Sequence, residues 1–135
     1  MGRKESGSFV MLPHTVLEHE NYARRSHRAI RLLIDLYGQY RGNNNGDLCL
    51  AWTIMTKKGW KSKDQLHKAK KELLDSGWII VTRQGGRNKC SLYAVTFKSI
   101  DYCNGKLDVK ETHAALGDWK GIQSVKITTP APNEG

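Results

Sequence analysis

The chain has 135 residues, of which 39% are hydrophobic, so it can fill one modest core and holds one domain with a tail. It carries 22 Lys and Arg against 13 Asp and Glu, and the net charge of +9 favours polyanionic partners, nucleic acid above all. No apolar run approaches the roughly 18 residues that span a bilayer, and no basic amphipathic helix stands apart, which argues against a membrane partner. The opening charges lead into no secretory signal, so we expect a cytoplasmic protein.

Cysteines and histidines show no spacing that is typical of a metal site. Cys49, Cys90 and Cys103 form no CxxC pair, and the five histidines form no HxH or HExxH pattern. We therefore expect reduced, partly buried thiols and neither a metal nor a cofactor. The sequence contains no P-loop, GxGxxG or Ser/His/Asp pattern, so we do not expect an enzyme.

The first part of the chain predicts a flexible start and two helices. Residues 1–8 are polar and contain glycine, and we expect them to be flexible. Pro13 can begin a short helix that runs to about His19, because proline is tolerated in the first turn. Ser26 is a good N-cap for a longer helix over residues 26–40. Its apolar residues recur at i, i+3, i+4 and i+7 as Ile30, Leu33, Ile34 and Tyr37, and Ala29, Leu32, Leu36 and Tyr40 widen this stripe.

A loop over residues 41–47 and a brief strand over residues 48–50 precede two further helices. The first helix covers residues 51–58, and Gly59 is placed to close it in the left-handed conformation. Ser62 and Gln65 form an S-x-x-Q capping box that opens the second helix, which ends at residues 76–77. Two helices that meet across a tight, glycine-containing turn are typical of helix-turn-helix geometry.

A β-hairpin and an irregular tail complete the predicted organisation. Residues 78–83 and 91–97 are rich in β-branched and aromatic side chains and flank a glycine-centred turn. Alternation along the second strand predicts one face on the core and the other open to solvent or a ligand. Beyond residue 101 the periodicity fades, and we expect residues 102–135 to be a largely irregular tail. Within it, Trp119 either docks back on the domain, which we favour, or serves as a binding anchor.

The order helix, short strand, helix, tight turn, helix and hairpin over residues 26–97 resembles the winged helix-turn-helix family. The resemblance is carried by GDLCLA at residues 46–51, by the S-x-x-Q-L start at Ser62 with KELLDSGWI at residues 71–79, and by the basic segment 83–89. More narrowly, the chain resembles winged-helix proteins of prophages and plasmids. The resemblance implies an α+β domain over residues 9–101, with a three-helix core and a small antiparallel sheet that forms a β-hairpin wing. It also implies DNA binding and no chemistry.

Positive charge is concentrated where such a module would meet DNA. Residues 57–89 hold ten basic and three acidic side chains, so they supply +7 of the chain's net charge of +9. At 100° per residue, the apolar residues of the helix that starts at Ser62 gather on one side and its lysines lie roughly opposite. This arrangement predicts a basic face that points away from the core.

Residue type suggests the role of each predicted DNA contact. Side chains in the first turns of that helix are placed to reach base edges, since lysine suits guanine and glutamine suits adenine. Lys57, Lys58 and Lys71 are better suited to phosphates, and Arg83 or Arg87 of the hairpin could enter a minor groove. The predicted set is Lys57, Lys58, Lys61, Ser62, Lys63, Gln65, His67, Lys68, Lys71, Arg83, Arg87 and Lys89. Arg24, Arg25 and Arg28 either clamp a flanking phosphate or form a solvated helix start.

The leading hypothesis is therefore a sequence-specific protein that binds double-stranded DNA, acting in transcription or replication, such as that of a mobile element. A homodimer would add affinity and specificity, because a lone winged helix contacts few base pairs. The alternative is a winged-helix adaptor that docks on a protein partner, with Trp119 and the tail as its anchor. Binding of RNA or single strands would call for exposed aromatic side chains among the lysines, and residues 61–71 offer none.

Overall fold

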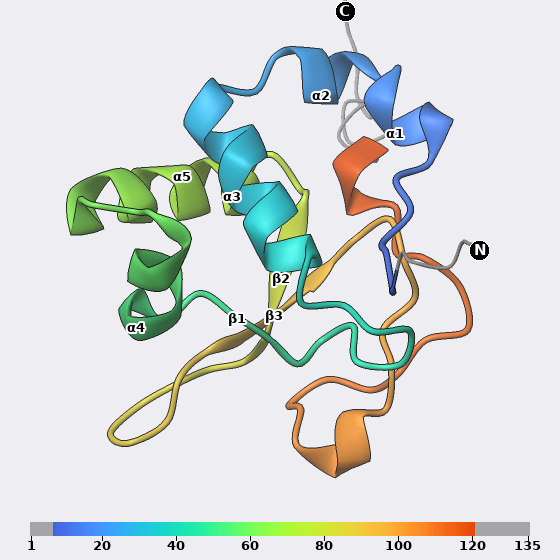
Figure 1. The fold of residues 1–135 in the computed structure, drawn as a ribbon. Coiled ribbons are helices and arrows are strands. Elements are labelled where there is room, and N and C mark those ends of the chain that lie inside the picture. The colour runs from blue at the N-terminus through green and yellow to red at the C-terminus, as the bar shows by residue number, and fades with distance from the viewer. Residues whose placement is uncertain (1–6, 121–135) are drawn as a thin grey trace, which may run out of the picture.

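The computed structural model describes residues 7–120. Most of the flexible start predicted for residues 1–8, and all of the tail beyond residue 120, therefore lie outside the described residues. The fold is mixed α+β, with helices packed around a small antiparallel sheet (Figure 1). Within the described part of the chain, no helix is both long enough and apolar enough to cross a bilayer.

Two short helices replace the single helix predicted after Pro13. Pro13 has φ −64° and ψ 144°, so it caps α1 (His14–Leu17) from outside instead of forming its first residue. α2 (Glu20–Ala23) follows directly, capped by the His19 side chain, which accepts a hydrogen bond from the Asn21 amide at 3.0 Å. The chain therefore changes direction at residues 18–19, where the sequence predicts the end of one helix.

The central helix α3 (His27–Tyr37) begins as predicted, with Ser26 Oγ accepting a hydrogen bond from the Ala29 amide at 3.1 Å. Its buried residues are Ala29, Leu32, Leu33, Leu36 and Tyr37. Ile34 is 40% exposed, so its predicted place in the buried stripe is wrong, because the stripe is centred on the other side of Leu33. The helix ends at Tyr37, before the predicted Tyr40. Beyond it, the Gln39 side chain makes two 2.8 Å hydrogen bonds with the backbone of Cys49.

A left-handed glycine joins the next two helices, as predicted. α4 (Trp52–Met55) runs into the 3-10 turn η1 (Thr56–Lys58), and Gly59 follows with φ 103°. A Cβ atom at Gly59 would lie 2.8 Å from the Arg31 guanidinium. That guanidinium donates to the Lys58 carbonyl and lies 5.2 Å from the centre of the Trp60 ring. The turn that leads into α5 (Lys63–Asp75) is thus held against α3.

The predicted hairpin is present, and the predicted short strand joins it in a three-stranded sheet. β1 (Leu48–Cys49), β2 (Ile79–Arg83) and β3 (Leu92–Val95) are antiparallel, in the spatial order β1-β3-β2. Tyr93 of β3 lies between Leu48 of β1 on one side and Val81 of β2 on the other. The register of β2 against β3 shifts between Val81 and Arg83, where the hairpin leaves the core.

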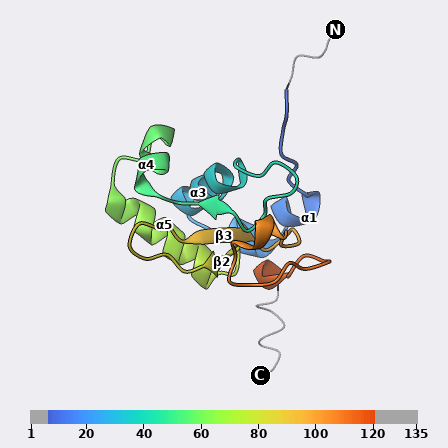
Figure 2. The ribbon, with the colours of Figure 1, turned by 90° about the horizontal axis from the view of Figure 1, so that it is seen from below.

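Both faces of the sheet are covered, so the prediction that one face of the second hairpin strand is open to solvent or a ligand is wrong. All four residues of β3 are buried. After β3 the chain crosses back over the sheet, where the amides of Asp108 and Gly117 donate to the carbonyls of Thr82 and Thr96 at 2.7 and 3.0 Å. Figure 2 shows this segment, drawn in orange and red, on the side of the sheet away from α3. It includes the 3-10 turn η2 (Cys103–Gly105) and is otherwise largely irregular.

Trp119 docks back on the domain, as we favoured. Its side chain is 5% exposed and stacks on Trp78, with ring centres 5.2 Å apart and planes inclined by 19°. The Trp78 ring in turn meets Phe97, which meets Tyr37 of α3. An aromatic column therefore connects the segment after the sheet to the central helix.

A buried asparagine fastens the loop after α3 to the end of β3. Asn45 is fully buried, and its side chain accepts from the Val95 amide and donates to the carbonyls of Val95, Lys98 and Ser99. The sequence marks Asn45 as part of a glycine-containing loop and predicts no burial. Its burial is offset by these hydrogen bonds, which replace those to water.

Candidate nucleic-acid interface

The start of α5 is defined by half of the predicted capping box. Ser62 Oγ accepts a hydrogen bond from the Gln65 amide at 3.1 Å. The Gln65 side chain does not return to Ser62 but accepts from Arg28 Nη1 at 2.8 Å. Asp64, in the first turn, suits the positive end of the helix dipole. Gln65, which the sequence assigns to base reading, is therefore engaged by the start of α3.

The two sides of α5 separate as its periodicity predicts. Leu66, Ala69 and Leu73 are buried in the core that α5 shares with α3. The other side is exposed to solvent and carries Asp64, His67, Lys68, Lys71 and Asp75. Lys63 is also exposed but lies at one flank, where its ammonium is 5.8 Å from the centre of the Trp52 ring. The structure thus presents His67, Lys68 and Lys71 on one outward surface.

Two carboxylates share this outward surface with the lysines. Asp64 pairs with Lys68 and Asp75 with Lys71, each at 3.1 Å, and all four side chains are more than half exposed. The predicted basic face includes only the lysines, although the i,i+4 spacing of both pairs is visible in the sequence. Exposed pairs of this kind contribute about 0–1 kcal/mol, so a phosphate can compete with each carboxylate.

The lysines of the α4–α5 turn extend the same basic region. Lys57, Lys58 and Lys61 are all exposed. Their backbone is positioned by the left-handed Gly59 and by the contacts of Arg31 that hold this turn on α3. Three predicted DNA contacts thus project from a turn that is fixed to the core.

The hairpin tip carries two exposed cations and is narrowed by a glycine. Arg87 and Lys89 are exposed, and Gly86 pairs with Lys89 across the tip. A Cβ atom at Gly85 would lie 2.5 Å from the Ser91 nitrogen, so the close approach of the two arms requires glycine. Arg83 instead braces the hairpin, because it is half-buried and donates to the Cys90 carbonyl at 2.9 Å.

The three basic segments lie on one side of the molecule. In Figures 1 and 2, α4, the N-terminal end of α5 and the hairpin tip all lie to the left, away from α1 and the segment that follows the sheet. The exposed predicted residues on this side are Lys57, Lys58, Lys61, Lys63, Gln65, His67, Lys68, Lys71, Arg87 and Lys89. Ser62 and Arg83, the other two predicted residues, are partly buried and serve as helix cap and hairpin brace.

A groove of about 540 Å³ borders α5 on the side of α2 and the start of α3. Arg24 and Arg28 are exposed at its rim, next to Lys68 and Lys71. Arg25 differs from them: its side chain is 19% exposed and lies 3.4 Å from Glu72. Of the three arginines with an open role, Arg25 is therefore structural, while Arg24 and Arg28 extend the basic surface of α5.

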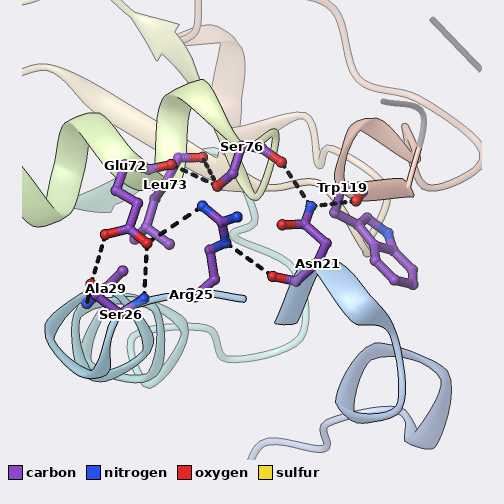
Figure 3. A network of polar contacts seen from close by, with 8 residues as sticks. All are labelled: Asn21, Arg25, Ser26, Ala29, Glu72, Leu73, Ser76 and Trp119. Carbon is purple, nitrogen blue, oxygen red and sulfur yellow. Dashed lines mark hydrogen bonds and ion pairs between the residues drawn. The ribbon is translucent and has the colours of Figure 1, made fainter. Parts of the chain in front are cut away.

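Glu72 is the centre of the polar network that joins α3 to α5 (Figure 3). Its carboxylate accepts from the Ser26 amide at 2.9 Å and from Ser26 Oγ at 2.6 Å, besides the contact with Arg25. Partial burial acts to raise the pKa of Glu72, but the hydrogen bonds from Ser26 and the charges of Arg25 and Arg28 outweigh it and lower that pKa. The cap of α3 is thereby bonded directly to α5.

The network continues to the segment after the sheet. Arg25 Nε donates to the Asn21 carbonyl at 2.9 Å, and Asn21 Nδ2 donates to the carbonyls of Ser76 and Trp119 at 2.9 and 2.6 Å. Figure 3 shows Asn21 between the end of α5 and Trp119. Nothing in the local sequence marks Asn21 or Glu72 for these roles, since their partners are distant in the chain.

No protein-family model, curated protein or solved structure matches the chain. Among residues 7–120, no three His, Cys, Asp or Glu side chains are grouped so as to hold a metal ion. What the described surface offers is an arrangement of exposed cations over a helix start, a turn and a hairpin.

Proposed function

We propose that this chain is a winged-helix protein that binds double-stranded DNA. The N-terminal half of α5 enters the major groove, and the hairpin acts as the wing on the neighbouring backbone. The observation that carries the proposal is the placement of the α4–α5 turn, the outward side of α5 and the hairpin tip on one side of the molecule. A helix that is buried along one side and capped at its start holds the backbone of its lysines in position, which limits the backbone entropy lost on binding.

Exposure and hydrogen-bond partners suggest a role for each residue. His67 and Lys68 are the outward residues nearest the start of α5 and are proposed to face base edges. Gln65 reaches a base only by exchanging its hydrogen bond with Arg28. The proposed phosphate contacts, which position without specifying, are Lys57, Lys58, Lys61, Lys63, Lys71, Arg87 and Lys89.

Concentrated charge supports this proposal on thermodynamic grounds. Residues 57–89 carry ten basic side chains against three acidic ones. A duplex that binds them releases condensed counterions, and this release favours binding at moderate salt. The pairs of Lys68 and Lys71 with Asp64 and Asp75 are exposed, so they can open as phosphates approach.

The protein is proposed to act inside the cell, as a transcriptional regulator or a replication-associated factor such as those of mobile elements. Binding as a homodimer would double the number of base contacts. The adaptor hypothesis takes Trp119 and the tail as its anchor. Trp119 is only 5% exposed and stacks on Trp78, and the tail beyond residue 120 lies outside the described residues. DNA binding is therefore the function that we propose.

Duplex binding as a function of salt tests the proposal. Lys68→Ala with Lys71→Ala is expected to weaken binding of a random-sequence duplex pool. It should lower the slope of log K against log salt by about 0.9, since Lys71 is the proposed phosphate contact of the two and each such contact is worth about 0.9. Lys106→Ala with Lys110→Ala is the matched control. It removes the same charge, including one ion-paired lysine, from the segment after the sheet. Equal slopes for the two double variants would falsify the proposal.

A further inference from the structure

Two cysteines that are distant in the sequence touch at the base of the hairpin. Cys49 Sγ and Cys90 Sγ are 3.3 Å apart, although 41 positions separate the residues. Cys49 ends β1 and lies opposite Leu92 of β3. Cys90 precedes Leu92 by two residues and is therefore the diagonal neighbour of Cys49 across the strand pair. Both residues are free thiols in this structure.

The two thiols differ in their access to solvent. Cys90 is exposed, whereas Cys49 is partly buried beneath the hairpin arm. Burial raises the pKa of the Cys49 thiol, and the hydrogen bond from the Ala51 amide only partly opposes this. An external reagent therefore meets Cys90 first, and Cys49 lies next to it as the second thiol of an exchange reaction.

We propose that Cys49 and Cys90 form a thiol–disulfide modification site whose co-reactant is a low-molecular-weight disulfide such as oxidised glutathione. The Cys90 thiolate attacks one sulfur of the reagent, forming a mixed disulfide and releasing one reduced thiolate. The Cys49 thiolate then attacks Cys90 Sγ, forming the protein disulfide and releasing the second thiolate. The two thiol protons leave with the two reduced molecules, so the protein is oxidised by two electrons and the reagent is reduced by two.

The geometry allows this bond with a small movement. The sulfurs must approach from 3.3 Å to about 2.0 Å. Cys90 lies between the hairpin tip and the first residue of β3, outside the regular ladder, so its backbone has room to adjust. Cys103 has no such neighbour, since its Sγ contacts the carbonyl of Asn45 at 3.8 Å. The site is therefore specific to one pair among the three cysteines.

The cross-link would fasten the return arm of the hairpin to β1. It closes a covalent loop over residues 49–90, which contains every lysine of the proposed interface. Arg83 already bonds to the Cys90 carbonyl at 2.9 Å, so the disulfide would add to an existing brace. If the hairpin is the wing of a DNA-binding protein, a consequence that rests on the proposed function, the oxidised form binds a duplex more tightly because its wing is pre-organised.

The test begins with the folded, full-length protein and oxidised glutathione at neutral pH. Mass spectrometry of the intact chain is expected to show the loss of two hydrogen atoms, and non-reducing peptide maps are expected to join Cys49 to Cys90. The Cys103→Ser control should form the same bond, whereas Cys49→Ser should stop at the mixed disulfide on Cys90. A folded protein that only accumulates mixed disulfides, or that links Cys103, overturns the proposed site.

Two further readouts separate this inference from the proposed function. Oxidation should raise the melting temperature, and reduction with dithiothreitol should reverse the rise. Duplex affinity should rise several-fold on oxidation and should not rise in Cys49→Ser, whose Cys90 carries the anionic glutathione group in place of the cross-link. A disulfide that forms without changing duplex affinity refutes the effect on the wing. A disulfide that forms in a protein that binds no duplex in either state upholds the site and refutes the DNA-binding function.

Discussion

Replacing both outward carboxylates of α5, as Asp64→Asn with Asp75→Asn, is expected to tighten duplex binding. Each carboxylate lies 3.1 Å from a lysine that the proposed interface presents to DNA. In the bound state a base edge or a phosphate must take the place of that carboxylate, and the displaced charge then lies close to the DNA. Removing the carboxylate abolishes both costs, while asparagine keeps the size of the side chain.

The size of the effect follows from the exposure of these pairs. All four side chains are 54–67% exposed, so solvent screens each pair to about 0.5 kcal/mol. Two pairs give about 1 kcal/mol, or roughly fivefold in affinity at low salt. The gain should shrink as ionic strength rises, because the Debye length falls to about 8 Å at 0.15 M.

Fluorescence anisotropy with a labelled duplex, over a range of salt concentrations, measures this gain. Glu18→Gln with Glu111→Gln is the matched control, because it changes the net charge equally at two exposed positions on other segments. The Asp64 and Asp75 variant should also unfold at a slightly lower temperature, since two i,i+4 pairs and a first-turn charge are lost. A gain in affinity no larger than that of the control would show that the outward side of α5 does not meet the DNA.

Three other variants test the packing around the site. Trp119→Ala should destabilise the fold by about 3–5 kcal/mol in urea unfolding, because a large buried ring is removed. Tyr102→Ala is the control, because Tyr102 is 62% exposed and should tolerate alanine. A similar loss of stability in both variants would refute the docked position of Trp119. Glu72→Gln should cost about 1–3 kcal/mol at pH 7. The pKa of Glu72 is lowered in the folded protein, so the carboxylate stabilises the fold above the ordinary glutamate pKa of about 4.3. This stabilisation is lost as pH falls through the folded pKa, so the stabilities of wild type and variant should converge in acid. A stability difference that stays constant with pH would contradict this role. Gly85→Ala should speed amide hydrogen exchange in the hairpin and Gly86→Ala should not, because of these two glycines only Gly85 would place a Cβ atom against the opposite arm. Equal exchange rates in the two variants would contradict the close approach of the arms at Gly85.

Much of the local structure could be predicted from neighbouring residues. The caps at Ser26 and Ser62, the left-handed Gly59 and the hairpin all depend on contacts within a few positions of the chain. The exposure of the lysines followed in the same way, because the apolar residues of α5 recur at helical spacing. These features need no knowledge of the partner element.

The composition of the candidate site was only partly predictable. The periodicity of α5 places Lys68 and Lys71 outward, but not the partners of the residues at its flanks. Gln65 is engaged by Arg28, and Arg83 by the Cys90 carbonyl, over separations of 37 and 7 positions. A hydrogen bond from a side chain to another segment depends on how the two segments pack, which residue type alone does not determine.

The sequence by itself determined the caps, the turns and the hairpin of this protein, because each is encoded by residues close together in the chain, and it determined the concentration of charge by composition alone. Only the tertiary structure decided that Ile34 faces solvent, that the second face of the sheet is closed, and that Trp119 completes the core on Trp78. Burial is a property of surfaces that meet, and residues 101–120 meet the sheet only after the chain has turned back across it.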